Sequence, residues 1–163
     1  MSNNPRSANM RANKSADTSP ELRVRRALHA LGVRYRLHVK TLPGKPDIVL
    51  PSRRAVVRVM GCYWHQHEGC KLASVPAKAK DYWQPKFART KARDAENEAA
   101  LAAAGWHVIT LWECDTRDAT KLDAATRGIA DLLQGIRLKP GRNSKAPKTD
   151  PARPRFPPAP LRA

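Results

Sequence analysis

Metal-binding and base-stacking side chains crowd into one stretch of the sequence, residues 55–70. An apolar run that ends at Met60 leads directly into a mixed group of cysteines, histidines and aromatics. The group consists of Cys62, Tyr63, Trp64, His65, His67 and Cys70. Cysteine and histidine are common zinc ligands, and aromatic rings offer flat surfaces on which bases can stack. We therefore expect the rest of the chain to supply partners to this stretch.

A structural zinc site is the first chemistry that these residues suggest, with His67, Cys70 and Cys114 as ligands. Three cysteines, two of them close to histidines, fit a metal site better than a disulfide framework. Asp94 is the candidate fourth ligand, because it lies seven residues from both Phe87 and Leu101 and so shares the buried face of their helix. A buried carboxylate needs either a metal or a salt bridge to a basic residue, and both explanations stay open.

The second chemistry that these residues suggest is hydrolysis assisted by a hard metal ion. Asp47 follows Pro46 at the mouth of a predicted hairpin, where nucleases place an aspartate that binds Mg²⁺. The next strand carries Arg58 as its one charged residue, so the Glu-x-Lys that usually accompanies such an aspartate is missing. His65 is the best-placed general base, and Glu21 is a candidate to orient it. The structural alternatives are a turn-capping role for Asp47 and a helix-dipole role for Glu21.

Two interpretations also apply to Tyr63, Trp64 and Trp83. They belong either to the core or to a wedge that enters DNA and unstacks its bases. The basic charge around them favours the wedge. Trp106 and Trp112 lie on a predicted strand, and we expect them in the core.

Hydrophobic periodicity and turn residues predict the elements that must position these side chains. Helices are expected over residues 19–32, 81–104 and 119–133, and strands over residues 33–39, 48–50, 55–60 and 106–112. The two strands 48–50 and 55–60 should pair as a hairpin. This order favours an α/β fold with a mixed central sheet and helices on its faces.

The formal net charge of +17 over 163 residues favours a polyanionic partner, most simply nucleic acid. A basic but inert surface is the alternative. The folded domain should span residues 19–135, between a basic arm (1–18) and a disordered Pro-rich tail (136–163) that carries half of the fourteen prolines. No signal peptide or apolar run of membrane-spanning length is visible, so we expect a cytoplasmic protein.

The chain resembles the bacterial very short patch repair endonucleases, which act on T:G mismatches. The motifs that carry the resemblance are RSANMRA, SPE, LPGKPDIV, GCYWHQHEGC, VPAKAKDYW, RD at 93–94 and AGWHVITLWEC, and they cover about residues 5–134. The resemblance implies a restriction-endonuclease-like fold with three layers and a structural Zn²⁺. It also implies Mg²⁺-dependent nicking of duplex DNA on the 5′ side of the T in a T:G mismatch that arises from deamination of 5-methylcytosine.

Matching positions imply a role for each site residue. Asp47 would bind Mg²⁺ through its carboxylate and Val59 through its backbone carbonyl, while His65 would be the catalytic histidine with Glu21 near it. Cys62 has no implied ligand role and is expected to pack in the interior. The implied zinc ligands are His67, Cys70, Asp94 and Cys114. The implied DNA-binding residues are Met10, Arg11, Tyr63, Trp64 and Trp83.

Met60 departs from the family pattern, because a histidine usually stands at its position. A methionine cannot accept a proton or stabilise a phosphate, so slower nicking, a relocated role or loss of activity would follow. The alternative function is therefore a zinc-stabilised mismatch-binding module with weakened or lost catalysis, and a third is restriction of unmismatched DNA. The expected partners are duplex DNA with a T:G mismatch and mismatch-repair proteins. We expect the protein to be a monomer that is associated with the nucleoid.

Overall fold

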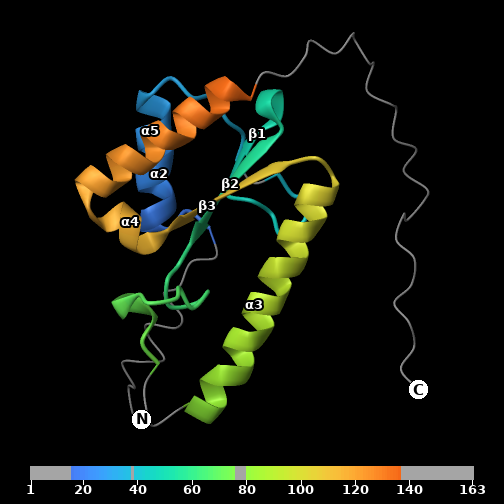
Figure 1. Ribbon diagram of the computed structural model, residues 1–163, viewed down its shortest axis with the longest axis vertical. Coiled ribbons are helices and arrows are strands. Elements are labelled where there is room, and N and C mark those ends of the chain that lie inside the picture. The colour runs from blue at the N-terminus through green and yellow to red at the C-terminus, as the bar shows by residue number, and fades with distance from the viewer. Residues whose placement is uncertain (1–15, 38, 76–79, 137–163) are drawn as a thin grey trace, which may run out of the picture.

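The computed structural model describes residues 16–37, 39–75 and 80–136 of the chain (Figure 1). Most of the predicted arm, with Met10 and Arg11, and all but residue 136 of the predicted tail lie outside the described residues. The described part has three layers, with a sheet between one long helix, α3, and a layer built from α2, α4 and α5. Among the described residues, no helix combines the length and the apolar composition that crossing a bilayer requires.

Three strands form the central mixed sheet, in the order β1-β2-β3: β1 (Ile48–Leu50), β2 (Ala55–Met60) and β3 (His107–Trp112). β1 and β2 form the predicted antiparallel hairpin, with Val49 opposite Val56. β3 runs parallel to β2, with Ile109 opposite Val57. The mixed α/β class is thus confirmed. The predicted strand over residues 33–39 is wrong, because among its described residues a single bridge joins Arg36 to Val49, and β1 is too short to pair further.

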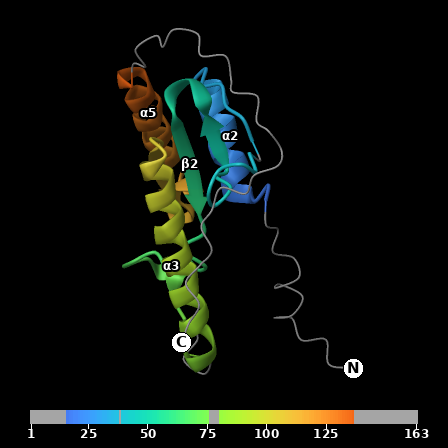
Figure 2. The ribbon, with the colours of Figure 1, turned by 90° about the vertical axis from the view of Figure 1, so that its right-hand side faces the viewer.

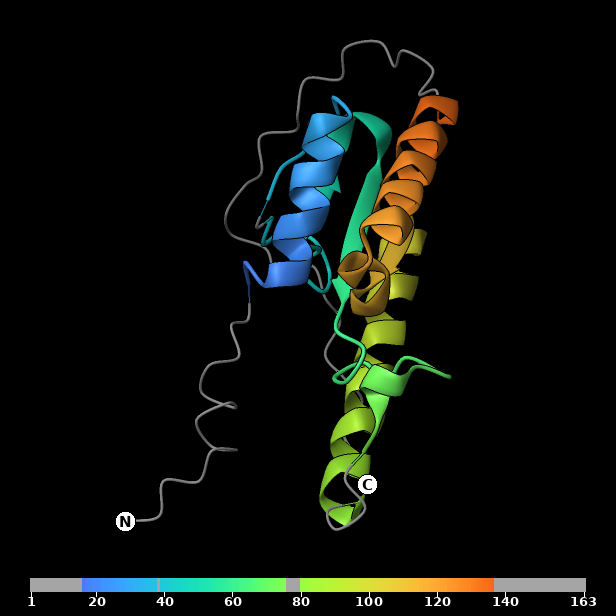
Figure 3. The same ribbon diagram turned by 90° about the vertical axis from the view of Figure 1, so that its left-hand side faces the viewer.

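The side chains of β2 alternate between two cores, as the period of a strand requires. Ala55 and Val57 pack beneath α2 (Ser19–Ala30) and α5 (Ala119–Gly135). Val56 faces the other way and packs with Leu101 of α3 (Lys80–Ala103). The alternation places Arg58 on the α3 side of the sheet, while Val59 packs against the core on the α2 side. Figure 3 shows α2 and α5 side by side across that face.

The three long helices match their predicted ranges to within two residues at each end. α2 has Thr18 as its N-cap and Pro20 in its first turn, and it buries Val24 and Leu28. α3 is longer than the strands that it covers, so its N-terminal half continues beyond the sheet (Figures 1 and 2). This overhang leaves the first turns of α3 available for a role other than covering the core.

A short helix that the sequence did not predict, α4 (Glu113–Arg117), follows β3 directly. Five residues are too few to show helical periodicity in a sequence. α5 then begins at Ala119, after the N-cap Asp118, whose carboxylate accepts a hydrogen bond from the backbone N–H of Lys121 at 2.9 Å. The turn into α4 brings Cys114 back toward the end of β2.

Candidate active site and metal centre

A cleft of about 1470 Å³ opens at the end of the sheet where β2 finishes and α2 begins. It collects the residues that the sequence predicted for catalysis, together with Met60. Its basic lining residues are Arg23, Lys40, Lys45, Arg58, Arg93 and Arg117. The acidic ones are Asp17, Glu21, Asp47, Asp94 and Glu113. Carboxylates surrounded by basic side chains suit a phosphodiester substrate that is bound with a divalent cation.

Asp47 lies in this cleft immediately before β1, and its carboxylate reaches across the hairpin. Its Oδ2 atom accepts a hydrogen bond from the backbone N–H of Val59 at 2.7 Å. Burial raises the pKa of Asp47, and the negative charge of Glu21 adds to that rise, although the Val59 hydrogen bond opposes it. A divalent cation at this position would relieve the cost of holding the carboxylate ionised. A carboxylate oxygen is a ligand type that Mg²⁺ prefers.

Glu21 is fixed by its own helix. Its carboxylate accepts hydrogen bonds from the Asp17 backbone N–H at 2.9 Å and from the Thr18 hydroxyl at 2.8 Å. It also forms a 2.9 Å ion pair with Arg25, and the side chain is buried. These contacts support the structural interpretation, in which Glu21 organises the start of α2. Through the cleft it acts on Asp47 by charge.

His65 has Asp94 as its partner. The distance between His65 Nδ1 and Asp94 Oδ2 is 2.5 Å, and Asp94 Oδ1 accepts a hydrogen bond from Arg58 Nη2 at 3.2 Å. The structure pairs His65 with Asp94, whereas the sequence suggested Glu21 as its orienting partner. A carboxylate at Nδ1 favours the tautomer with its proton on that atom, which makes Nε2 the basic nitrogen. Asp94, whose side chain is 16 % exposed, thus forms the salt bridge to a basic residue that the sequence offered as one of two explanations.

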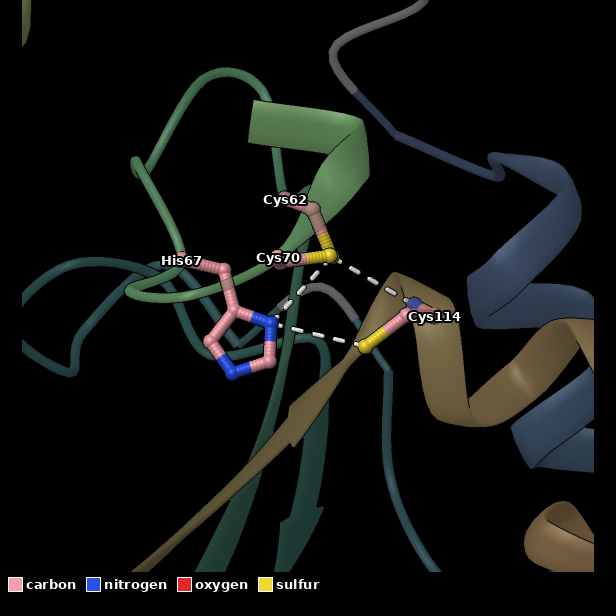
Figure 4. A group of neighbouring side chains, drawn as sticks. All are labelled: Cys62, His67, Cys70 and Cys114. Carbon is pink, nitrogen blue, oxygen red and sulfur yellow. Dashed lines mark hydrogen bonds between the residues drawn. The ribbon is translucent and has the colours of Figure 1, made fainter. Parts of the chain in front are cut away.

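Four side chains form a compact group that could hold a metal ion: Cys62, His67, Cys70 and Cys114 (Figure 4). Their ligand atoms all lie within 4.8 Å of one another. His67 Nδ1 is 3.6 Å from Cys62 Sγ and 3.4 Å from Cys114 Sγ. In a tetrahedral zinc site, usual bond lengths place neighbouring ligand atoms about 3.6 Å apart, so the group fits a zinc ion in both size and chemistry.

The fourth member of this candidate group is Cys62, where the sequence predicted Asp94. The sequence assigned Cys62 to packing, and its side chain is indeed fully buried, yet its sulfur faces the other three donors. The spacing Cys62-x4-His67-x2-Cys70 was the signal that could have identified it. Asp94 does not belong to the group because its carboxylate is engaged with His65 and Arg58.

The thiols of this group differ in acidity. Burial raises the pKa of the Cys62 thiol to about 12 and also raises the pKa of Cys114. The pKa of Cys70 is lowered, chiefly by the backbone N–H of Leu72. A bound divalent cation would favour the thiolate forms of all three and would offset the cost of burial.

Neighbouring residues hold the members of the candidate metal group in place. The His67 ring stacks on Trp112, with centroids 4.1 Å apart and planes 4° from parallel. The backbone N–H of Cys114 donates to Cys62 Sγ at 3.4 Å, and that of Cys62 donates to Glu113 Oε2 at 3.3 Å. Together these contacts tie the loop after β2 to the start of α4.

An aromatic cluster joins the same loop to the overhanging start of α3. Tyr63, Trp64 and Trp83 contact one another edge to face, with centroids 5.2 to 5.9 Å apart. The structure thus brings together the three aromatics that the sequence predicted for stacking, and Trp64 is 37 % exposed. The sequence missed Tyr82, which is 56 % exposed, and Lys86, whose ammonium lies 4.1 Å from the Tyr82 ring centroid.

Comparison with known proteins finds related sequences over most of the chain. Residues 1–71 match the family model described as DNA mismatch endonuclease Vsr. The chain is 51 % identical over 118 residues to the type II nicking enzyme V.XorIIP of Xanthomonas oryzae pv. oryzae, covering 72 % of this chain and 86 % of that protein. It is 36 % identical over 132 residues to the DNA mismatch endonuclease Vsr of Escherichia coli, covering 80 % and 84 %. It is 37 % identical over 123 residues to V.NmeAIP, a type II nicking enzyme of Neisseria meningitidis, covering 73 % and 87 %.

Proposed function

Because this chain belongs to the Vsr family of DNA endonucleases, we propose that it nicks duplex DNA on the 5′ side of the T in a T:G mismatch left by deamination of 5-methylcytosine. The observation that carries the proposal is the cleft, which joins the Asp47 carboxylate, the end of β2 and the His65–Asp94 pair among basic side chains. Since one chain supplies all these groups, we propose that a monomer acts on DNA.

Asp47 and the backbone carbonyl of Val59 would hold Mg²⁺ in this reaction. The bound ion would neutralise phosphate charge and make a coordinated water more acidic. His65 would accept a proton from the attacking water through Nε2, while Asp94 holds the ring and stabilises its protonated form. Water then adds to phosphorus as the bond from phosphorus to the leaving sugar oxygen breaks. That oxygen takes up a proton from solvent, and no covalent enzyme intermediate is required.

The second metal would be structural. Three cysteines and one histidine would fill all four positions of a tetrahedral Zn²⁺ with protein ligands, which would leave no position for a substrate. By joining the loop after β2 to α4, this ion would hold His65 at the edge of the cleft.

The aromatic cluster would read the mismatch. Tyr63, Trp64 and Trp83 would enter the duplex beside the T:G pair and stack on its bases. A weakened pair costs less to open than a correct one, which supplies part of the selectivity. Met10 from the arm would contribute from the other side, as the family resemblance implies.

Met60 favours a second candidate function, a mismatch-binding module with weakened or lost catalysis. It lines the cleft beside Val59 and Gly61, and its thioether offers neither a proton acceptor nor a charge. This candidate retains the zinc and the aromatic wedge but predicts little or no turnover.

The test uses two labelled duplexes that differ only in carrying T:G or T:A, incubated with the full chain and Mg²⁺. We expect a cut in the T-containing strand of the T:G duplex alone, and its loss in Asp47→Ala. Asp123→Asn, on the exposed face of α5, is the matched control and should cut normally. Selective binding without a cut would favour the second candidate, and Met60→His should then restore nicking. Equal cutting of both duplexes would contradict mismatch repair.

A further inference from the structure

Arg58 is a charged residue in the middle of the central strand β2, and its side chain is only 10 % exposed. Burying a guanidinium group is costly unless partners replace its water. Its neighbours in the strand, Val56 and Val57, show that apolar side chains fill the adjacent positions well. The presence of an arginine here therefore needs an explanation other than packing.

Two carboxylates of α3 receive the guanidinium. Nη2 of Arg58 lies 3.2 Å from Asp94 Oδ1, and Nη1 lies 3.5 Å from Glu98 Oε2. Asp94 and Glu98 are one helical turn apart, so both meet the planar fork of the arginine. Glu98 is 57 % exposed, whereas Asp94 is 16 % exposed. The pair with Asp94 is therefore the less hydrated of the two and the stronger.

The other oxygen of Asp94 contacts His65 Nδ1 at 2.5 Å. A continuous series of polar contacts thus runs from β2 through α3 to the cleft, in the order Arg58, Asp94, His65. A carboxylate held by one hydrogen bond can rotate about its terminal torsion, which is soft. A second, charge-assisted bond on the opposite oxygen fixes the plane of the carboxylate.

We propose that Arg58 is a positioning residue for DNA nicking, which acts through Asp94 to hold the His65 ring with Nε2 available as the base. This inference rests on the proposed function and adds to it a residue outside the predicted site. Lysine cannot replace the arginine fully, because an ammonium group lacks the planar fork that reaches two carboxylates together.

A direct contact between Arg58 and the DNA phosphate is the competing explanation, because Arg58 also lines the cleft. The two roles predict different kinetics. Loss of a phosphate contact weakens DNA binding and raises KM, whereas loss of a positioning contact lowers kcat and leaves KM unchanged.

The kinetic experiment compares the full chain with Arg58→Met, Arg58→Lys and Glu98→Gln on the T:G duplex. We expect kcat to fall about 10- to 100-fold in Arg58→Met, as for loss of other groups that orient a functional histidine, with KM changed less than about twofold. Arg58→Lys should recover part of kcat, and Glu98→Gln, which removes the more exposed of the two partners, should lower kcat less than Arg58→Met does. An unchanged kcat, with or without a rise in KM, would overturn the proposal.

A second measurement does not depend on turnover. Nitrogen-15 NMR of the histidine rings, assigned with His65→Gln, reports the tautomer of His65 in the full chain. We expect one tautomer, with the proton on Nδ1, in the wild type and a mixture in Arg58→Met. A single unchanged tautomer in that variant, or in Arg58→Lys if Arg58→Met does not fold, would contradict the positioning role. If the wild type and Arg58→Met differ in this way but the wild type does not nick DNA, the result would count against the proposed function alone.

Discussion

Asp47 and Glu21 both line the cleft, yet their carboxylates have different surroundings. Glu21 receives hydrogen bonds from Asp17, Thr18 and Arg25. Asp47 receives one from Val59, and burial raises its pKa. Asp47 is thus the carboxylate whose ionised form a cation would stabilise, and without one it costs the fold some stability.

Asp47→Asn should abolish nicking and yet raise the unfolding temperature at neutral pH without added Mg²⁺. An amide oxygen can still accept the Val59 hydrogen bond, and the cost of burying a charge is removed. The folded-state pKa of Asp47 is raised, so the wild type takes up a proton on folding and gains stability as the pH falls toward 3.8, the ordinary aspartate value. The difference between the two proteins, followed by thermal melts, should therefore narrow on acidification. A difference that widens would contradict this account.

The presence of Cys62 in the candidate metal group, where the sequence predicted Asp94, gives a direct comparison between two variants. We expect freshly purified wild type to contain one zinc per chain. Cys62→Ser should lose this zinc and should unfold at a temperature lower by roughly 5 °C or more, because a structural metal ion contributes to folding. Asp94→Asn should keep one zinc per chain but lose most of its nicking activity. Metal analysis and melting curves of both variants check this. Zinc loss in Asp94→Asn with retention in Cys62→Ser would restore the original ligand set.

At the scale of elements, α3 connects three parts of the molecule. Its C-terminal end buries Leu101 against the sheet, its middle presents Asp94 to His65, and its overhanging start carries Trp83. The aromatic cluster therefore has a fixed position relative to the cleft, because one helix bears residues of both. In the proposed function, this helix would hold the mismatch-binding aromatics and the cutting site at a constant separation.

Trp64→Ala should weaken binding to the T:G duplex about tenfold, since stacking of one base on an aromatic ring contributes about 1–3 kcal/mol. Trp64 is 37 % exposed, so its loss should affect the fold little. Leu132→Ala, at a 50 % exposed apolar position on α5, is the control and should bind normally. Fluorescence anisotropy without Mg²⁺ measures both. Equal weakening for T:A and T:G duplexes would argue against a role in mismatch reading.

The sequence predicted elements well wherever periodicity is long or turns are marked. The hairpin of β1 and β2, the three long helices and β3 follow from such patterns. The strand over residues 33–39 failed because alternation cannot tell whether a partner strand is long enough to pair with it. The partner of Asp94 was equally inaccessible, since a helix face can be read from spacing, but the side chains opposite it come from β2 and its following loop. Cys62 was missed because burial and ligation look alike in a sequence.

Positive charge extends along the sequence beyond the residues that the structure describes. Residues 137–163 contain eight basic side chains and one acidic one, and the remaining chain is still strongly basic. The basic cleft lining belongs to that remainder. Affinity for DNA should therefore have a part that depends on the mismatch and a part that depends on salt alone.

Deletion of residues 137–163 should weaken binding to T:G and T:A duplexes by the same factor. The slope of log Kd against log salt should become shallower, by about 0.9 for each phosphate contact that is lost. Titrations at several salt concentrations measure it, with nicking at saturating DNA as the control, which should be unchanged. A loss confined to the T:G duplex would assign mismatch recognition to this segment.

The order of residues in the loop after β2 has one more consequence. Tyr63, Trp64 and His65 lie between two members of the candidate metal group, Cys62 and His67. The same group therefore anchors the residues proposed for mismatch binding and the histidine proposed for catalysis. If oxidation of the thiols disrupted the group, the aromatic rings and the imidazole would lose their positions together. The oxidised protein would then be inactive and would not become a nuclease that cuts intact chromosomal DNA at random.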